Sequence, residues 1–505
     1  MSSASYSHVL KYTWLFGGVQ GLGLLVGILR NKAVAMFLGP TGLALMNIYN
    51  TAANLLNQST NLGISFSAIK DIASQQATGD TEAVRKSVRS VRTWSVLAAL
   101  LGVVLTLIAS PALSYFTFGN YQYTSAFAAL SLMVGMMTIT GGELAILKGL
   151  KCLKRVAAVS VLCGVLSLIV YVPIYGFWGM SGIIPALLLS TLGILLIHLY
   201  YSHKVMPWQL RGINRSTLKY GIPFVKLGLA FIVAGVFGQG AEYVMRALLL
   251  RVGGIDTVGY YNCGFIMVVS YASLVFTAVE NDYFPRLSSV IHQRHAMIDT
   301  VNKQIEVCVL LVAPVLVVFV LFMPIAVPLL FSSAFSHAVS MSTCAVFYIF
   351  FKALTLPAGY LPLAAGHSKV YMGMEIIYDV LLALSVPLSY HLGGLQGIGW
   401  GLSAMGLIDL LLIHSVYRFK YGYKFKSTSP LVLVVQFLLL SVTVYAALCL
   451  PLMLRCLVGV VCAVISITLS VRLFNREANL WSKVKGFLAR FKKCFLGMPF
   501  QGCKF

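Results

Sequence analysis

The chain has 505 residues, of which 59% are hydrophobic and 10% are charged, and its formal net charge is +23. A soluble domain carries about 25% charged residues, so this composition excludes an ordinary soluble enzyme. It also excludes an outer-membrane β-barrel, whose strands would alternate polar and apolar residues in segments of about ten.

Long apolar segments follow one another along the whole chain. A membrane-spanning helix needs about 20 apolar residues. Segments 93–142 and 156–203 contain no Lys, Arg, Asp or Glu, so each accommodates two spans and a tight turn. We therefore predict an all-α polytopic membrane protein with about 14 transmembrane helices. The spans are expected at 10–38, 42–69, 93–114, 123–147, 156–175, 180–201, 220–249, 256–281, 304–330, 338–362, 369–391, 394–417, 430–453 and 456–473.

Basic residues lie on one side of this predicted topology. Every loop after an even-numbered span contains Lys or Arg, as in 70–92, 148–155 and 417–426, whereas loops after odd-numbered spans carry only Arg251 and Arg455. Cytoplasmic loops are enriched in Lys and Arg, so both termini are expected in the cytoplasm. The first apolar segment is too long for a signal peptide and is expected to be the first span. Orientation in the membrane therefore explains the net charge, and no nucleic-acid partner is expected.

Segments separated by about 215 residues resemble one another. Segments 33–50 and 245–262 both pass from a long span through a Gly-containing turn into the next span, and segments 178–188 and 394–404 share a Gly-Ile pair. A repeat of six helices gives both copies the same orientation. We predict two pseudo-symmetric six-helix bundles, related by an axis along the membrane normal, around a central cavity.

The remaining residues form two further parts after the bundles. The expected organisation is an N-terminal bundle (1–210), a C-terminal bundle (211–420), a two-helix transmembrane hairpin (421–473) and a cytoplasmic tail (474–505). In the tail, apolar residues recur at helical spacing among Lys and Arg. This pattern predicts a basic amphipathic helix that lies on the anionic inner leaflet of the lipid bilayer.

Five cations lie within or at the ends of predicted spans. Arg30 and Lys32 are near the end of the first span, Arg246 and Arg251 hold the corresponding place in the seventh, and Lys352 is inside the tenth. A charge in bilayer hydrocarbon costs at least about 2.5–3.5 kcal/mol. Arg30 could reach the outer interface by snorkelling. The alternative is a cationic cavity for an anionic substrate, and a diphosphate suits the bidentate fork of arginine.

Acidic residues within the spans are the natural counterparts of these cations. They are Glu143, Glu242, Glu375, Asp379 and Asp409. Buried cations need anions, so these carboxylates are candidates for charge pairing or for coupling to a proton or sodium gradient. The ten cysteines form no CxxC pair and the nine histidines are scattered, so no metal and no cofactor are expected.

The motifs LGPTGLA and GIDTVGYY, together with the duplicated fourteen-span plan, resemble the polysaccharide flippase branch of the multidrug/oligosaccharidyl-lipid/polysaccharide exporter superfamily. The similarity covers nearly the whole chain and is strongest to the Wzx-type O-antigen translocases. It implies transfer of a polyprenyl-diphosphate-linked oligosaccharide from the inner to the outer leaflet of the bacterial inner membrane, by alternating access and coupled to an ion gradient. A polysaccharide polymerase would be a candidate partner.

The resemblance also implies roles for particular cations. Related peptidoglycan-precursor flippases have cavity arginines on the first and seventh helices, and Arg30 and Arg246 occupy the matching places. Lys32, Arg251 and Lys352 extend this expected diphosphate site. The first extracellular turn lacks the acidic residue often found in peptidoglycan-precursor flippases, which favours the O-antigen type.

Two other functions stay open from the sequence. A drug/cation antiporter of the same superfamily would need an acidic cavity, whereas the most marked charges within the spans are basic. A membrane polysaccharide polymerase or ligase would carry a sizeable external loop with catalytic Arg or His, and every predicted external loop is short.

Overall fold

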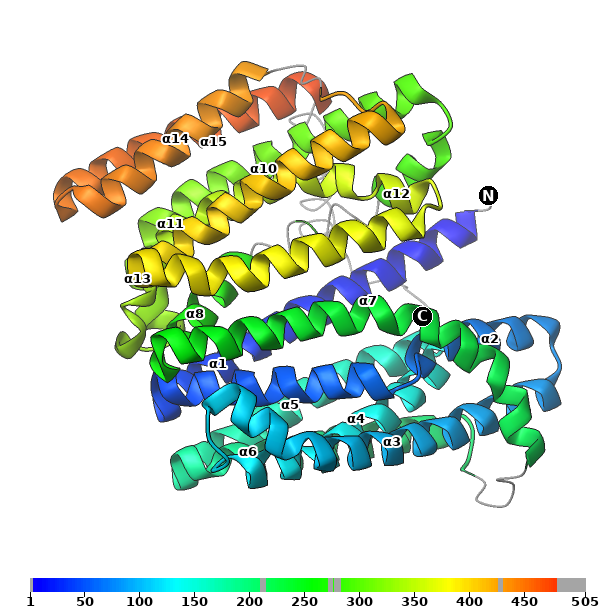
Figure 1. The fold of residues 1–505 in the computed structure, drawn as a ribbon. Coiled ribbons are helices and arrows are strands. Elements are labelled where there is room, and N and C mark those ends of the chain that lie inside the picture. The colour runs from blue at the N-terminus through cyan, green and yellow to red at the C-terminus, as the bar shows by residue number, and fades with distance from the viewer. Residues whose placement is uncertain (1–2, 209–214, 271–275, 277–282, 426–429, 479–505) are drawn as a thin grey trace, which may run out of the picture. The chain divides into compact units, whose positions relative to one another are not determined.

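The computed structural model describes residues 3–208, 215–270, 276, 283–425 and 430–478 (Figure 1). Throughout these ranges the regular elements are helices, with no strand. Within the described residues, nine helical segments are long and apolar enough to cross a membrane. Leu153–His203, with 51 residues, and Ser368–Tyr421, with 54, each exceed the length of two crossings of about 30 Å at about 1.5 Å per residue. The predicted all-α, polytopic membrane fold is confirmed.

The helices follow the order of the predicted spans. The first half contains α1 (Ser3–Thr60), α2 (Ile64–Thr78), α3 (Thr81–Phe118), α4 (Thr124–Gly149), α5 (Leu153–Trp178), η1 (Gly179–Gly182) and α6 (Ile183–His203). The rest contains α7 (Arg215–Gly253), α8 (Ile255–Phe265), η2 (Ile266–Ser270), α10 (Arg294–Leu330), η3 (Ser333–Phe335), α11 (Ala338–Gly359), α12 (Leu361–Ala364), α13 (Ser368–Tyr421), α14 (Pro430–Cys449) and α15 (Leu452–Ala478).

Apolar side chains on the outer faces of these helices fit a lipid environment. Ile108 on α3 is 71% exposed and Leu329 on α10 is 62% exposed. Bilayer hydrocarbon, unlike water, imposes no cost on such exposure. Large exposed apolar surfaces mark membrane contact.

One predicted span ends earlier in the structure than expected. The second span was expected to continue to residue 69, but α1 ends at Thr60 because Leu62 and Gly63 adopt positive φ angles of 53° and 63°. The Asn61 side-chain oxygen accepts a hydrogen bond from the Gly63 N–H at 2.7 Å. α2 is therefore a separate helix.

The helix α2 packs onto the first half through one apolar face. Its buried residues Ile64, Ala68 and Ile72 recur every four positions, as one face of a helix requires. They join a core of buried apolar residues from α3, α4 and α7: Val84, Val88, Val91, Ala98, Ala145, Ile146 and Val225. This cluster fixes the ends of four helices at one side of the bundle.

Backbone angles repeat at three turns separated by 215 residues. Gly39 (φ 63°, ψ −164°) matches Gly254 (φ 80°, ψ 173°), and Gly179 (φ 51°, ψ −131°) matches Gly394 (φ 59°, ψ −147°). These conformations are open to glycine but not to other residues. Lys151 (φ 54°) likewise matches Gly366 (φ 73°). The three matches support the predicted duplication, whereas symmetry between whole bundles stays a prediction.

By their internal contacts the residues form two compact units. Unit 1 comprises 1–270, 324–345 and 367–405, and unit 2 comprises 271–323, 346–366 and 406–505. Helices α10, α11 and α13 contribute to both units. The predicted boundaries at 210 and 420 refer to the duplication and stay a prediction. The predicted tail helix lies outside the described residues, apart from its first few, as do most of residues 271–282 of the eighth span.

Candidate functional site

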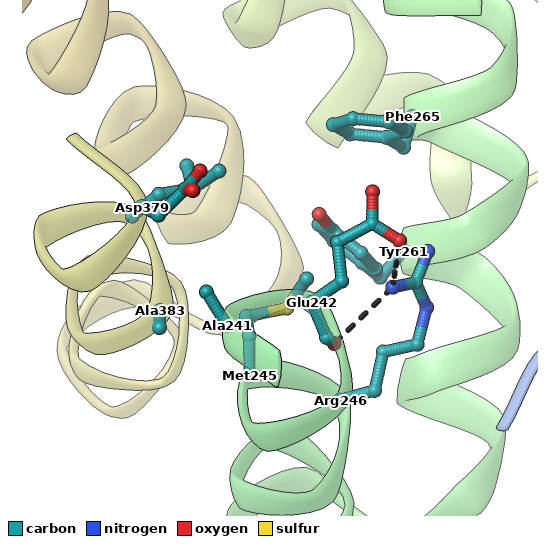
Figure 2. A pocket seen from close by; sticks show the side chains of 9 residues that line it. Ala241, Glu242, Met245, Arg246, Tyr261, Phe265, Asp379 and Ala383 are labelled. Atoms are coloured by element: carbon teal, nitrogen blue, oxygen red, sulfur yellow. Dashed lines mark hydrogen bonds and ion pairs between the residues drawn. The ribbon is translucent and has the colours of Figure 1, made fainter. Parts of the chain in front are cut away.

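A pocket with three charged side chains lies among α7, α8 and α13 in unit 1 (Figure 2). Its empty space is about 310 Å³, and part of it is open to the surroundings. Glu242 and Arg246 reach it together because an i,i+4 spacing places them on one face of α7. The lining residues are Ala241, Glu242, Met245, Arg246, Tyr261, Phe265, Asp379, Leu382 and Ala383.

Arg246 is held in this pocket by two partners. The side chain is 7% exposed. Its Nη1 donates to Glu242 Oε2 at 3.1 Å and to the Glu242 carbonyl oxygen at 3.2 Å, and its Nε donates to Asn262 Oδ1 at 3.1 Å. Asn262 on α8 is 2% exposed, and its Nδ2 has no hydrogen-bond partner within the described ranges. The seventh-helix arginine is therefore a paired cation, fixed between α7 and α8.

The charges in the pocket do not sum to a cationic site. Glu242 and Asp379 supply two carboxylates against the single guanidinium of Arg246, which gives a formal charge of −1 when both acids are ionised. Figure 2 shows Asp379 across the pocket from the Glu242–Arg246 pair. Glu242, when ionised, offsets the charge of Arg246 and so weakens its attraction for an anion.

Arg30 has a different environment on α1. The residue is partly buried, and its Nε is enclosed with no hydrogen-bond partner among the described residues. Tyr175 on α5 is 1% exposed, and its hydroxyl also lacks a hydrogen-bond partner among the described residues. An unsatisfied buried donor costs about 1–3 kcal/mol. The first-helix arginine therefore presents an unused donor.

Lys32 and Arg251 bind the ends of other helices. Lys32 Nζ donates to the carbonyl oxygen of Leu329 in the last turn of α10. Arg251 Nη2 donates to the Tyr115 carbonyl oxygen at 2.7 Å, in the last turn of α3, and its guanidinium lies 5.7 Å from the Phe116 ring centroid. Carbonyl groups at a helix C-terminus carry partial negative charge. Both cations thus satisfy carbonyl groups, and the structure does not bring them into the pocket.

Lys352 and Asp409 form an ion pair in unit 2. The Lys352 Nζ lies 3.8 Å from Asp409 Oδ2, and Asp409 is 6% exposed. Thr355, one turn from Lys352, donates its hydroxyl to the Lys352 carbonyl oxygen at 3.4 Å. The pair links α11 to α13 within this unit. Charge pairing is the role that this geometry shows for both residues.

Glu143 belongs to a buried structural cluster. Its Oε1 and Oε2 accept from Arg92 Nε at 3.1 Å and Nη2 at 3.2 Å, and Glu143 is 1% exposed. Arg92 also donates to the carbonyl oxygens of Met206 at 2.8 Å and Pro207 at 3.1 Å. The pair ties α3 and α4 to the segment after α6.

The two acidic residues predicted to lie on one face of α13 have different surroundings in the structure. Asp379 lines the pocket, whereas Glu375, one turn away, is exposed and does not. The helical spacing correctly places them near one face. The spacing alone does not show which turn of that face lies at the pocket beside α7.

Several residues with buried polar contacts could not be identified from the sequence alone. Asn262 is the last residue of the GYYN segment, and this segment indicates the internal repeat but not a contact with Arg246. Arg92 stood among the cations of a predicted cytoplasmic loop, although it is 7% exposed. The available signal for Arg92 was Glu143, a carboxylate within a predicted span that needs a cation as its partner. Tyr175 carried no signal beyond its place in an apolar span.

Solved structures with this fold are transporters of the superfamily that the sequence resembles. A multidrug resistance MATE transporter of the MOP superfamily, in an inward-facing conformation, has a TM-score of 0.66 and 16% identity, covering 79% of this chain and 94% of that chain. The lipid II flippase MurJ, in an inward closed conformation, has a TM-score of 0.64 and 15% identity, covering 93% and 99%. These likenesses establish the fold.

A MOP superfamily transporter from Pyrococcus furiosus, described as having a binding pocket of reverse polarity, has a TM-score of 0.54 and 15% identity, covering 82% of this chain and 96% of that chain. No curated protein matches the sequence. The model of one sequence family, described as polysaccharide biosynthesis protein, matches residues 33–340, which is more than half of the chain. The predicted resemblance to the polysaccharide branch is confirmed, and this multi-pass membrane protein belongs to the polysaccharide biosynthesis protein family.

Proposed function

We propose that this protein is a flippase that moves a polyprenyl-diphosphate-linked oligosaccharide, an O-antigen or related surface-polysaccharide unit, across the bacterial inner membrane. The observation that carries the proposal is the buried Nε of Arg30, within the long apolar helix α1, which has no hydrogen-bond partner in the described part of the chain. Hydrocarbon offers no partner for it, so an anionic ligand is the natural acceptor. The sequence family and the shared fold with MurJ support the same substrate class.

In this proposal the two arginines have different tasks. Arg30 binds a diphosphate oxygen with its unused donor. Arg246 contributes after its ion pair with Glu242 is broken, and protonation of Glu242, driven by a proton gradient, would break that pair. Transport by alternating access, cytoplasmic termini and a polymerase partner are parts of the same proposal.

One observation favours a second candidate. The pocket around Arg246 holds more carboxylates than guanidinium groups, as a drug/cation antiporter would require, and the MATE transporters share its fold. A polymerase or ligase fits less well, because the turns 119–123 and 331–337 are too short to hold an external catalytic domain.

The direct test is transport by the purified wild-type protein in proteoliposomes. We expect transfer of a fluorescent polyprenyl-diphosphate oligosaccharide between leaflets, measured by access to an external glycosidase, and no uptake of a cationic dye. Protein-free vesicles set the background. Dye uptake without lipid transfer would favour the antiporter and reject the flippase.

The change Glu242→Gln separates the two candidates by the sign of its effect. The amide keeps the shape of the side chain but leaves Arg246 without its counter-charge, so a flippase should bind polyprenyl diphosphate about tenfold more tightly, or about 1.4 kcal/mol. An antiporter should instead lose affinity for cations. Ligand titration of the detergent-solubilised protein measures both.

The matched control for this test is Glu375→Gln, on α13 and outside the pocket. It removes the same charge from an exposed position, so it should leave both affinities unchanged. An equal effect of the two variants would mean that the whole charge of the protein, rather than the pocket, controls binding.

A further inference from the structure

Two residues at equivalent places in the repeat bind one another. The Thr41 hydroxyl, just after the break in α1, donates to Asp256 Oδ1 at the start of α8. Their numbers differ by 215, the same offset that relates Gly39 to Gly254 immediately before them. The first half and the second half of the duplication therefore meet through corresponding turns, and both turns belong to unit 1.

The backbones also touch beside this hydrogen bond. A Cβ atom on Gly259 of α8 would lie 2.2 Å from the Pro40 carbonyl oxygen, so only glycine allows this approach. This contact brings the backbones of α1 and α8 close together beside the Thr41–Asp256 hydrogen bond.

Further polar contacts at the same helix ends join the two halves of the sequence. Ser332 Oγ, after α10, donates to the Ala35 carbonyl oxygen at 3.4 Å. The contacts from Lys32 to the end of α10 and from Arg251 to the end of α3 also cross between the halves. All these residues lie in unit 1.

We infer that the Thr41–Asp256 pair is the centre of a releasable latch that closes one end of the substrate path between the two halves. The inference rests on the proposed alternating-access function. The predicted orientation places this latch at the periplasmic end. Its bonds are few, polar and individually weak, so the bound halves can separate within a transport cycle.

The first test measures opening of the latch in the absence of any transport substrate. A cysteine replaces Ala35, which is 2% exposed, in a background where the exposed Cys449 and Cys456 are changed to serine. A membrane-impermeant maleimide is added to intact spheroplasts. We expect slow labelling, which Thr41→Val accelerates about tenfold because the bond to Asp256 is lost.

The matched control is Thr124→Val. The Thr124 hydroxyl donates to the Tyr121 carbonyl oxygen of its own turn at 2.7 Å, so its removal should leave the labelling rate unchanged. Equal rates in the Thr41→Val variant and its parent, or equal acceleration by both valine variants, would overturn the latch. Labelling from the cytoplasmic side alone would overturn its periplasmic placement.

A second measurement ties the latch to transport. The double variant Thr41→Cys/Asp256→Cys is oxidised, with the two single variants as controls. Lipid transfer should stop in the cross-linked protein and return on reduction, whereas continued transfer when cross-linked would overturn the inference. If the wild type transports no lipid-linked sugar, the proposed function fails, and the labelling rates still decide whether the latch exists.

Discussion

Arg30→Ala is expected to reduce lipid-linked oligosaccharide transport at least a hundredfold while leaving the folded protein intact. Hydrogen bonds to charged groups contribute about 1.5–3 kcal/mol each, so loss of two diphosphate contacts corresponds to a factor of about 10² or more. Because Arg30 Nε has no hydrogen-bond partner among the residues that the structure describes, its removal should not lower the thermal stability. Transfer in proteoliposomes and the unfolding temperature measure the two effects.

Two further variants define what Arg30 contributes. Arg30→Lys keeps the charge but loses the planar fork, so transport should fall only about tenfold, equivalent to about 1.4 kcal/mol. Arg251→Ala removes a guanidinium that binds the Tyr115 carbonyl oxygen, and it should leave substrate affinity unchanged. Full transport by Arg30→Ala would assign Arg30 to snorkelling at the membrane interface.

Arg92→Ala is expected to destabilise the protein by about 3–5 kcal/mol, the effect of leaving a buried carboxylate without its partner. Glu143 is 1% exposed, and the carbonyl oxygens of Met206 and Pro207 lose their donor in the same change. A domain has about 5–15 kcal/mol of stability in total. The yield of folded protein and its unfolding temperature should therefore both fall sharply.

The control for Arg92 lies on the same helix. Arg85 pairs with Glu82 at 3.9 Å, and both side chains are largely exposed, so Arg85→Ala should change stability little. The double variant Arg92→Met/Glu143→Gln removes both charges and should recover part of the loss. Equal stability of Arg92→Ala and Arg85→Ala would show that the buried pair contributes no more than a surface one.

The helical plan could be predicted because its causes are local. Apolar length determines where a helix can cross a membrane, and glycine marks breaks such as Gly39 and Gly394, whose conformations other residues rarely adopt. The early end of α1 was missed because Leu62, a residue that rarely takes a positive φ, shares the turn with Gly63. The contact between Gly63 and Gly228 of α7 is distant in sequence and left no local pattern.

The charged site was harder to predict than the fold. Sequence position placed Lys32, Arg246 and Arg251 at similar depths, but their partners are a carbonyl of α10, a carboxylate of α7 and a carbonyl of α3. Depth along one helix does not reveal which neighbouring helix ends beside it. Glu242 was recognised as a counter-charge, whereas the support from Asn262 depends on the packing of α7 against α8.

The matching turns have a consequence for how the two halves came to differ. Backbone angles agree at three positions 215 residues apart, yet the side chains there and nearby have diverged, with Lys151 opposite Gly366 and Thr41 opposite Asp256. A duplicated gene would start with two identical halves. The two halves therefore share the path of the backbone at these turns but differ in how their arginines are paired: Arg30 Nε has no hydrogen-bond partner among the described residues, whereas Arg246 is paired with Glu242.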